Sequence, residues 1–202
     1  KKKIKFVHDL IDLKECDLVF FSKDIPTNNK DKSLYDGIYK LIKRAIRHLN
    51  KKSTLIILSQ VKPGFTDSVK WSKKNLYYQV ETLIFGEAVN RALKPEQFIV
   101  GAFDNKINKK YLKFLKSYKS RINIMNYKSA ELAKISINLY LISSLSFTNS
   151  LAEACEKIDA DWSKIQPILK QDKRIGKYAY LNPGLGILSG NLQRDLQSYK
   201  KI

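Results

Sequence analysis

The chain has 202 residues, of which 44% are hydrophobic, 8 are Gly and 5 are Pro. This composition excludes an intrinsically disordered protein and suffices for one large domain or two small ones with a hydrophobic core. No apolar run approaches the roughly 20 residues of a membrane-spanning helix, and no apolar signal-peptide core follows the basic start. We therefore expect a cytoplasmic protein with no membrane partner.

The net charge of +19 is the most unusual property of the composition. Lys and Arg bind nucleic acids by releasing counterions from the phosphate backbone, but here they are spread along the chain and form no nucleic-acid-binding motif. We expect a solvated basic surface that favours small anionic ligands, and no specific nucleic-acid partner. Two cysteines and two distant histidines fit no metal-ligand spacing, so no metal site is predicted.

The first 123 residues alternate short apolar runs with helical patterns. Strands are predicted at 4–7, 17–21, 53–58 and 99–101, with a turn at 26–29. Apolar residues recur at helical spacing with Lys and Arg on the other face, which predicts an amphipathic helix over 33–50. These apolar positions are Ile38, Leu41, Ile42, Ala45, Ile46 and Leu49. Strands that alternate with helices are typical of a parallel sheet built of βαβ units.

The pattern changes after residue 123. Residues 129–157 contain no Gly or Pro and carry apolar residues on more than one face, which predicts one long helix buried by other helices or by a second subunit. Cys155 lies in this stretch and is predicted to be a core cysteine. A further short helix is predicted at 161–169. We place a domain boundary near 123–125, between an α/β part and an all-helical part.

A glycine-rich stretch near the C-terminus is the strongest local signal of a site. Gly184, Gly186 and Gly190 lie within seven residues, which indicates backbone that turns sharply or approaches a ligand closely. Polar residues follow at once, so the stretch predicts a site loop that runs into a helix. It is not a dinucleotide fingerprint, because Ser189 stands where the third glycine would be and no clear strand precedes it.

Four segments, in chain order, each resemble a known motif. L-S-Q-V-K-P-G at 58–64 resembles S-T-V-P-P-G, and Y-Q-V-E-T-L-I-F-G-E-A at 78–88 with L-K-P at 93–95 resembles N-P-E-F-L-R-E-G-x-A with L-x-P. S-A-E-L-A-K at 129–134 with S-F-T-N at 146–149 resembles S-A-E-L-x-K with S-F-x-N, and L-N-P-G-L-G at 181–186 with R-D at 194–195 resembles L-N-P-G-x-G with K-D. These are motifs of the nucleotide-sugar dehydrogenases, the UDP-glucose/GDP-mannose 6-dehydrogenase family. The resemblance covers nearly the whole chain.

The resemblance implies an α/β fold in two parts. Residues 1–123 would be the later part of an NAD-binding Rossmann-type domain, with its parallel sheet. Residues 124–202 would be the all-helical middle domain, which forms a homodimer through the long helix near 129–157. The glycine fingerprint of the cofactor domain would precede Lys1 and a second α/β domain would follow Ile202, so we expect a partial chain.

The resemblance also implies a reaction: two successive NAD-linked oxidations of a sugar carbon in a UDP- or GDP-sugar, as used in polysaccharide biosynthesis. Lys134 matches the lysine that stabilises developing oxyanion charge, and Asn138 matches its amide partner. Their spacing of four places both on one helix face. Asn138 lies among apolar residues, so we expect a polar partner for its side chain.

Other positions take family roles in the same way. Glu81 matches a glutamate near cofactor and substrate that positions groups or exchanges protons, and Asp195 matches the aspartate that assists water or proton transfer. Gln60 and Arg194, with Glu81, stand at cofactor-binding positions; Arg194 replaces a lysine. The predicted substrate-binding residues are Glu81, Lys134, Asn138, Tyr180, Asn182, Gly184 and Gly186.

Several positions depart from the family pattern. Asn191 stands where the family has the cysteine nucleophile, and an amide cannot form the covalent thiohemiacetal. Gln60 replaces a threonine, Phe85 a glutamate and Leu188 a glycine. We therefore expect no second oxidation by the cysteine route. The alternative is a non-catalytic remnant of the family that dimerises or binds nucleotide sugars.

Overall fold

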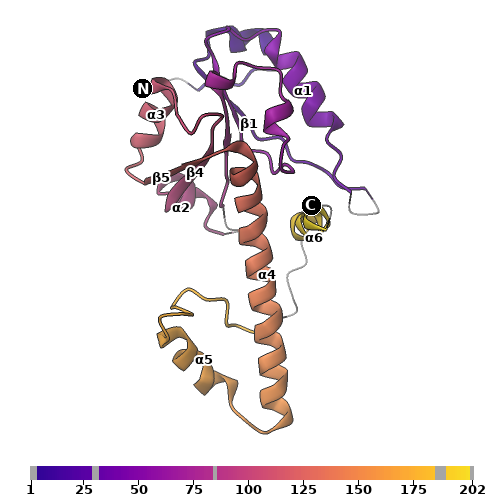
Figure 1. The fold of residues 1–202 in the computed structure, drawn as a ribbon, viewed down its shortest axis with the longest axis vertical. Coiled ribbons are helices and arrows are strands. Elements are labelled where there is room, and N and C mark those ends of the chain that lie inside the picture. Colours follow the sequence, from indigo (N-terminus) through magenta and orange to yellow (C-terminus); the bar gives the residue numbers. More distant parts are fainter. Residues whose placement is uncertain (1–3, 29–31, 84–85, 185–189, 201–202) are drawn as a thin grey trace. The chain divides into compact units, whose positions relative to one another are not determined.

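The computed structural model describes residues 4–28, 32–83, 86–184 and 190–200 (Figure 1). Within the last range, it describes Gly190, Asn191 and Gln193 by their backbone alone. The chain divides into two compact units, Lys1–Lys134 and Ile135–Ile202. The long helix α4 (Tyr127–Lys157) begins in the first unit and ends in the second. Within the described residues, no helix is long and apolar enough to cross a membrane.

The first unit is built on a five-stranded sheet with the strands in chain order. Its strands are β1 (Leu18–Phe21), β2 (Thr54–Ile57), β3 (Leu76–Gln79), β4 (Gln97–Gly101) and β5 (Arg121–Met125). β1, β2 and β3 run parallel, as do β4 and β5, whereas β3 and β4 are antiparallel. The α/β fold is thus confirmed, but the all-parallel sheet is corrected at the β3–β4 pair.

The predicted strand at 4–7 is wrong, since these residues have no regular secondary structure and Phe6 is 96% exposed. The predicted strands at 17–21, 53–58 and 99–101 correspond to β1, β2 and β4. β3 and β5 were not predicted as strands. A short helix, α2 (Ala88–Leu93), lies in the connection between β3 and β4.

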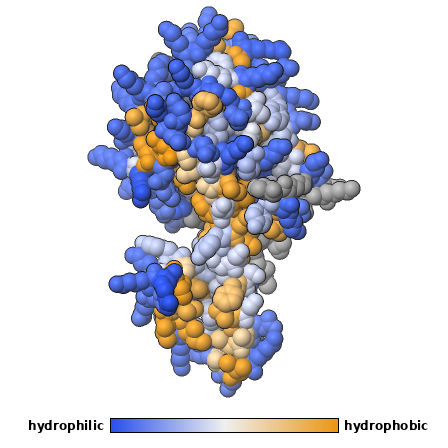
Figure 2. Space-filling view, viewed as in Figure 1, coloured by the Kyte–Doolittle hydropathy of each residue, from blue (hydrophilic) through white to orange (hydrophobic). Residues whose placement is uncertain are grey.

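Helices cover the sheet with the faces that their sequences predict. The helix α1 (Asp36–Ile46) buries Ile38, Ile42 and Ala45, which recur at helical spacing, and exposes its basic residues. The helix α3 (Lys109–Lys116) is capped by the Asn108 side chain and buries Tyr111. Among its described residues, the unit also has the short 3-10 helices η1 (Leu10–Glu15), η2 (Thr66–Ser68) and η3 (Lys73–Asn75). On the face that Figure 2 shows, most of the surface of this unit is hydrophilic, with apolar patches between.

Gly101, at the end of β4, permits a close approach between the sheet and the start of α4. A Cβ atom there would lie 3.1 Å from the Tyr127 Cα, 3.1 Å from the Ala130 Cβ and 3.2 Å from the Tyr78 Cβ. We expect Gly101→Ala to lower the free energy of unfolding by about 1–3 kcal/mol, because backbone must shift to admit the methyl group. In urea unfolding, the control Gly37→Ala should be neutral or stabilising, since a Cβ there meets only the flexible end of Lys23.

The second unit is helical, as predicted. It contains the rest of α4, then α5 (Trp162–Gln171) and α6 (Gly190–Tyr199). The predicted helices at 129–157 and 161–169 are confirmed, and the glycine-rich stretch does lead into a helix. α5 lies beside the last turns of α4 (Figure 1). Cys155 is buried, as predicted.

Candidate functional site

Two residues from different motifs meet in the second unit. The Asn138 side-chain amide on α4 donates a hydrogen bond to the Asp195 carboxylate on α6, with 2.6 Å between Nδ2 and Oδ2. Asp195 is 1% exposed and its neighbour Arg194 is 3% exposed. Asn138 therefore has the polar partner that its apolar surroundings predict. A buried carboxylate held by an amide is an acceptor of fixed orientation, suited to proton transfer.

The loop that precedes the glycine-rich stretch is fastened to α4 through its backbone. The buried Thr148 hydroxyl donates to the carbonyl of Tyr180 at 2.8 Å. The Asn149 side chain makes two bonds to Gly184: its Nδ2 donates to the glycine carbonyl at 2.9 Å, and its Oδ1 accepts from the glycine N–H at 3.0 Å. Thr148 and Asn149, both in the motif at 146–149, thus hold the loop at Tyr180 and Gly184.

Helix α5 holds the same loop from its other side. The Trp162 Nε1 and the Gln166 Nε2 both donate to the Leu181 carbonyl, each at 3.1 Å. Gln166 also donates to the side-chain oxygen of Asn182. Backbone groups between residues 180 and 184 are therefore committed to the scaffold, which fixes the loop before any ligand arrives.

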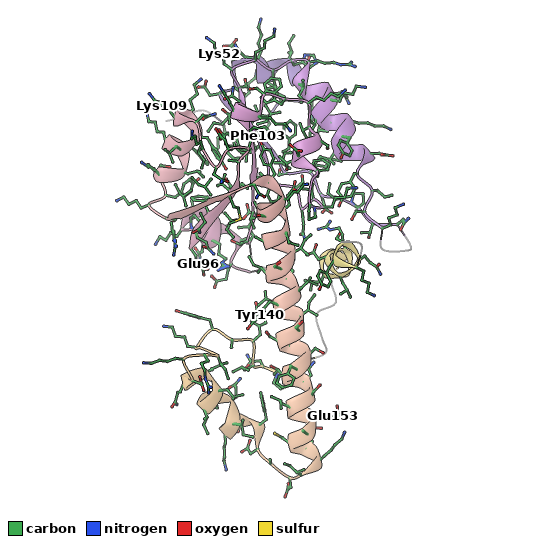
Figure 3. All side chains as sticks on the ribbon, in the orientation of Figure 1. Lys52, Glu96, Phe103, Lys109, Tyr140 and Glu153 are labelled. Carbon is green, nitrogen blue, oxygen red and sulfur yellow. The ribbon has the colours of Figure 1, made fainter. Side chains whose placement is uncertain are left out.

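Two cavities border this loop. One, of about 380 Å³, is lined by Leu145, Lys177, Tyr178, Ala179, Tyr180, Leu181, Asn182 and Gly184. Three of the predicted substrate-binding residues thus line one cavity. The other, of about 500 Å³, is bordered by apolar residues of α4 and α5 and includes Tyr140, which Figure 3 places on α4. Lys177 and Tyr178 were not among the predicted site residues, although both lie within three residues of Tyr180.

Asn149 offers a test of how firmly the loop is held. Asn149→Asp keeps an oxygen that accepts from the Gly184 N–H but loses the donor to the Gly184 carbonyl. We expect the free energy of unfolding of the variant to be lower by about 1–3 kcal/mol, and we expect faster amide exchange at Gly184. Ser150→Ala is the control, because the Ser150 hydroxyl bonds only to the Ser146 carbonyl of its own helix. Equal amide exchange in the two variants would contradict the prediction.

A third cavity, of about 210 Å³, lies at the carboxyl ends of β1, β2 and β3 in the first unit. Its lining includes Leu58, Gln79, Glu81 and Thr82, together with residues from α2, β4 and α3. Glu81 is half-buried, and its carboxylate accepts from the Thr82 N–H at 3.0 Å. In open α/β sheets, ligands bind outside the carboxyl ends of the parallel strands. Sites that enclose a drug-sized ligand have volumes of about 300–1,000 Å³. This cavity is smaller, so it can enclose only one end of a dinucleotide.

The remaining predicted site residues lie apart from these contacts. Lys134 is half-buried on α4, one turn before Asn138. Gln60 is half-buried in the segment that follows β2. The backbone of Asn191 lies in the first turn of α6, and its side chain is not described. Phe85, Gly186 and Leu188 lie outside the described residues. Among the described side chains, no group of three or more His, Cys, Asp and Glu could hold a metal ion.

One buried carboxylate of the first unit had no role in the sequence analysis. Glu131, in the first turns of α4, is fully buried and accepts hydrogen bonds from the backbone N–H groups of Gly64 at 2.5 Å and Thr66 at 2.8 Å. Burial raises the pKa of Glu131 above its ordinary value, and the hydrogen bonds from Thr66 and Gly64 oppose that rise. The available signal for this buried carboxylate was a glutamate directly after the small Ala130, in a helix that the sequence pattern predicts to be buried.

Comparison with known proteins gives a consistent result. Residues 128–201 match the family model described as UDP-glucose/GDP-mannose dehydrogenase family, central domain. The UDP-glucose 6-dehydrogenase of Rickettsia bellii is 28% identical over 200 residues, which are 95% of this chain and 46% of that protein. UDP-glucose 6-dehydrogenase YwqF of Bacillus subtilis is 23% identical over 94% of this chain and 48% of its own length. The chain thus spans about half the length of these relatives.

Solved structures agree on the fold. A UDP-glucose dehydrogenase from Pyrobaculum islandicum superposes with a TM-score of 0.82 at 21% identity, over 97% of this chain and 48% of its own. A GDP-mannose dehydrogenase from Pseudomonas aeruginosa, solved as a ternary complex, gives 0.74 at 17% identity, over 96% and 48%. Residues 128–201 of the chain therefore match the central domain of the UDP-glucose/GDP-mannose dehydrogenase family.

Proposed function

We propose that the chain is part of an NAD-dependent nucleotide-sugar dehydrogenase that oxidises an alcohol carbon of a UDP- or GDP-sugar. The observation that carries the proposal is the contact between Asn138 and Asp195, since it joins two motif residues that are 57 positions apart. Both residues match positions to which the family resemblance assigns chemistry. The relatives' names, which include UDP-glucose 6-dehydrogenase, support the same reaction class.

The proposed chemistry uses a small number of side chains. Lys134 and Asn138, one turn apart on α4, stabilise the negative charge that develops on the sugar oxygen as its proton leaves. Asp195, oriented by Asn138, accepts a proton directly or through water. NAD, when bound, takes the hydride and supplies the redox chemistry.

We propose that the nucleotide sugar binds against the loop formed by residues 180–184. Tyr180, Asn182 and Gly184 border the cavity of about 380 Å³. Apart from its chain neighbours, no atom of the described residues lies within 4 Å of the place where a Cβ of Gly184 would be. Lys177 borders the same cavity and supplies a positive charge for the diphosphate. Gly186 lies outside the described residues and keeps its predicted role as a proposal.

In the first unit, the proposed NAD contacts are at the carboxyl edge of β1–β3. Gln60 and Glu81 follow β2 and β3 and offer amide and carboxylate groups at the edge where such sheets bind dinucleotides. Arg194, at the third proposed cofactor position, supplies a positive charge. The cavity beside Glu81 fits one end of the cofactor.

Two further features complete the proposal. The chain forms a homodimer through α4, on which Tyr140 is 76% exposed and Phe147 is 66% exposed, so that a partner would cover apolar surface. The protein acts in the cytoplasm. Because Asn191 occupies the position of the family nucleophile, the second oxidation does not follow the covalent cysteine route.

Ligand-dependent thermal stability tests the proposal. A ligand that binds only the folded protein stabilises it by RT ln(1 + [L]/Kd), about 2.7 kcal/mol at 100 times Kd. We expect UDP-glucose or GDP-mannose, and NAD, to raise the melting temperature, whereas glucose and mannose should not. No shift with any nucleotide sugar would contradict the proposal. Stabilisation without NADH formation would instead favour the non-catalytic binding remnant.

A further inference from the structure

Glu131 links two segments of the first unit that carry proposed site residues. Its carboxylate lies under the turn that follows β2, and its two oxygens accept from the N–H groups of Gly64 and Thr66 separately, Oε2 from Gly64 and Oε1 from Thr66. The turn is 65 or more residues away in sequence. Glu131 itself precedes Lys134 by one turn of α4.

The turn depends on this carboxylate for its shape. Gly64 has φ of +90°, a left-handed conformation that a residue with a side chain adopts only with strain. The residues that follow, Phe65 and Thr66, are 1% and 0% exposed, so water cannot replace the acceptors that their segment needs. A carboxylate offers two acceptor oxygens for two N–H donors, which an amide cannot do.

We propose that Glu131 is a positioning residue for the dehydrogenase reaction, because it fixes the turn after Gln60 to the helix that carries Lys134. This inference rests on the proposed function, in which Gln60 contacts NAD and Lys134 contacts the sugar oxygen. Glu131 touches neither ligand: it sets the separation of the groups that do. A displacement of about 1 Å in such a group can cost on the order of 10²-fold in rate.

The test is Glu131→Gln, which keeps the shape of the side chain but turns an –NH₂ group toward one of the two N–H donors. We expect the KM for NAD to rise and kcat/KM for NAD to fall by on the order of 10²-fold. Amide exchange at Gly64 and Thr66 should accelerate in the same variant. Glu153→Gln is the matched control, since Glu153 is an exposed carboxylate of the same helix (Figure 3); it should change neither quantity.

A second variant separates positioning from simple loss of structure. Gly64→Ala strains the same turn through its φ, while its Cβ would meet no atom closer than the Lys128 Cε at 4.0 Å. Both single variants should raise the KM for NAD, and the double variant should be no worse than the more severe single one, because both release one turn. Glu131→Asp keeps a carboxylate and should recover part of the loss. A purely structural role would lower the folded fraction and leave the KM unchanged.

The outcomes separate this inference from the proposed function. If the unmodified protein forms NADH and the Glu131→Gln variant has the same KM for NAD as the unmodified protein, the inference is overturned. If the unmodified protein neither turns over nor binds a nucleotide sugar, the proposed function fails, and amide exchange then decides whether Glu131 holds the turn. Unchanged exchange at Gly64 and Thr66 in Glu131→Gln overturns the inference in that case as well.

Discussion

Replacing Asp195 by Asn should reduce kcat by about 10²–10⁴-fold, the range that a positioned proton-transfer group contributes. The new amide has the size of the carboxylate and still offers an oxygen to the Asn138 Nδ2, so the contact between α4 and α6 can persist. The charge that accepts a proton is lost. The fold should therefore survive while the chemistry fails, and NADH formation together with thermal unfolding measures both.

The control for this prediction is Asp159→Asn. Asp159 is exposed in the same unit and has φ of 56°, a conformation that Asn tolerates. It removes the same charge at a distance from the Asn138–Asp195 contact. A similar loss of kcat in both variants would mean that Asp195 acts through the net charge of the protein, and that outcome would refute its proposed role.

Replacing Lys134 by Met should lower kcat by about 10²–10³-fold, the cost of removing one donor that stabilises an oxyanion. Met keeps the length of the apolar stem, so the half-buried position on α4 stays filled. Lys134→Arg should recover only part of the rate, since the planar guanidinium places its donors differently from an ammonium group.

The KM for the sugar adds detail to the Lys134 prediction. We expect the KM to change less than kcat, because the charge on the sugar oxygen develops mainly in the transition state. Lys157→Met is the control: Lys157 lies on the same helix, is exposed and pairs with Glu153 at 2.7 Å. A Lys134→Met enzyme with the wild-type kcat would exclude Lys134 from the chemistry.

The helices of this protein could be predicted from its sequence because their periodicity is a local property. The apolar positions Ile38, Ile42 and Ala45 recur at 3.6-residue spacing, and α1 buries these three. Residues 129–157 contain no helix breaker, and α4 covers them all. The compact division of the chain falls inside this continuous helix, where no change in the sequence pattern marks it.

The strands were harder to predict, because a strand needs a partner that its own sequence does not name. Residues 4–7 have the apolar character of a strand, but within the described structure β1 pairs only with β2. β3 was not recognised, since its short Tyr-rich run Leu76–Gln79 directly follows the polar residues 72–75 and ends in a polar residue. Its antiparallel pairing with β4 follows from how the connection returns through α2, which hydrophobic pattern alone does not encode.

The site was accessible from the sequence to different degrees. Asn138 in an apolar helix predicted a polar partner, and the identity of that partner, Asp195, required the fold. Asn149 holds Gly184 through hydrogen bonds to its backbone, and such bonds cannot be predicted from the types of the side chains. Glu131 was quoted as part of a motif, yet its bonds to Gly64 and Thr66 depend on long-range packing between a turn and a helix.

The most direct measurement of the central claim is the ratio of NADH formed to nucleotide sugar consumed, with UDP-glucose or GDP-mannose as the limiting substrate and the product identified by mass spectrometry. With Asn191 at the position of the nucleophile, we predict one NADH per sugar and an aldehyde product. Two NADH per sugar, with acid formation that a thiol-blocking reagent abolishes, would contradict the assignment of Asn191. No NADH from either nucleotide sugar would contradict the dehydrogenase itself.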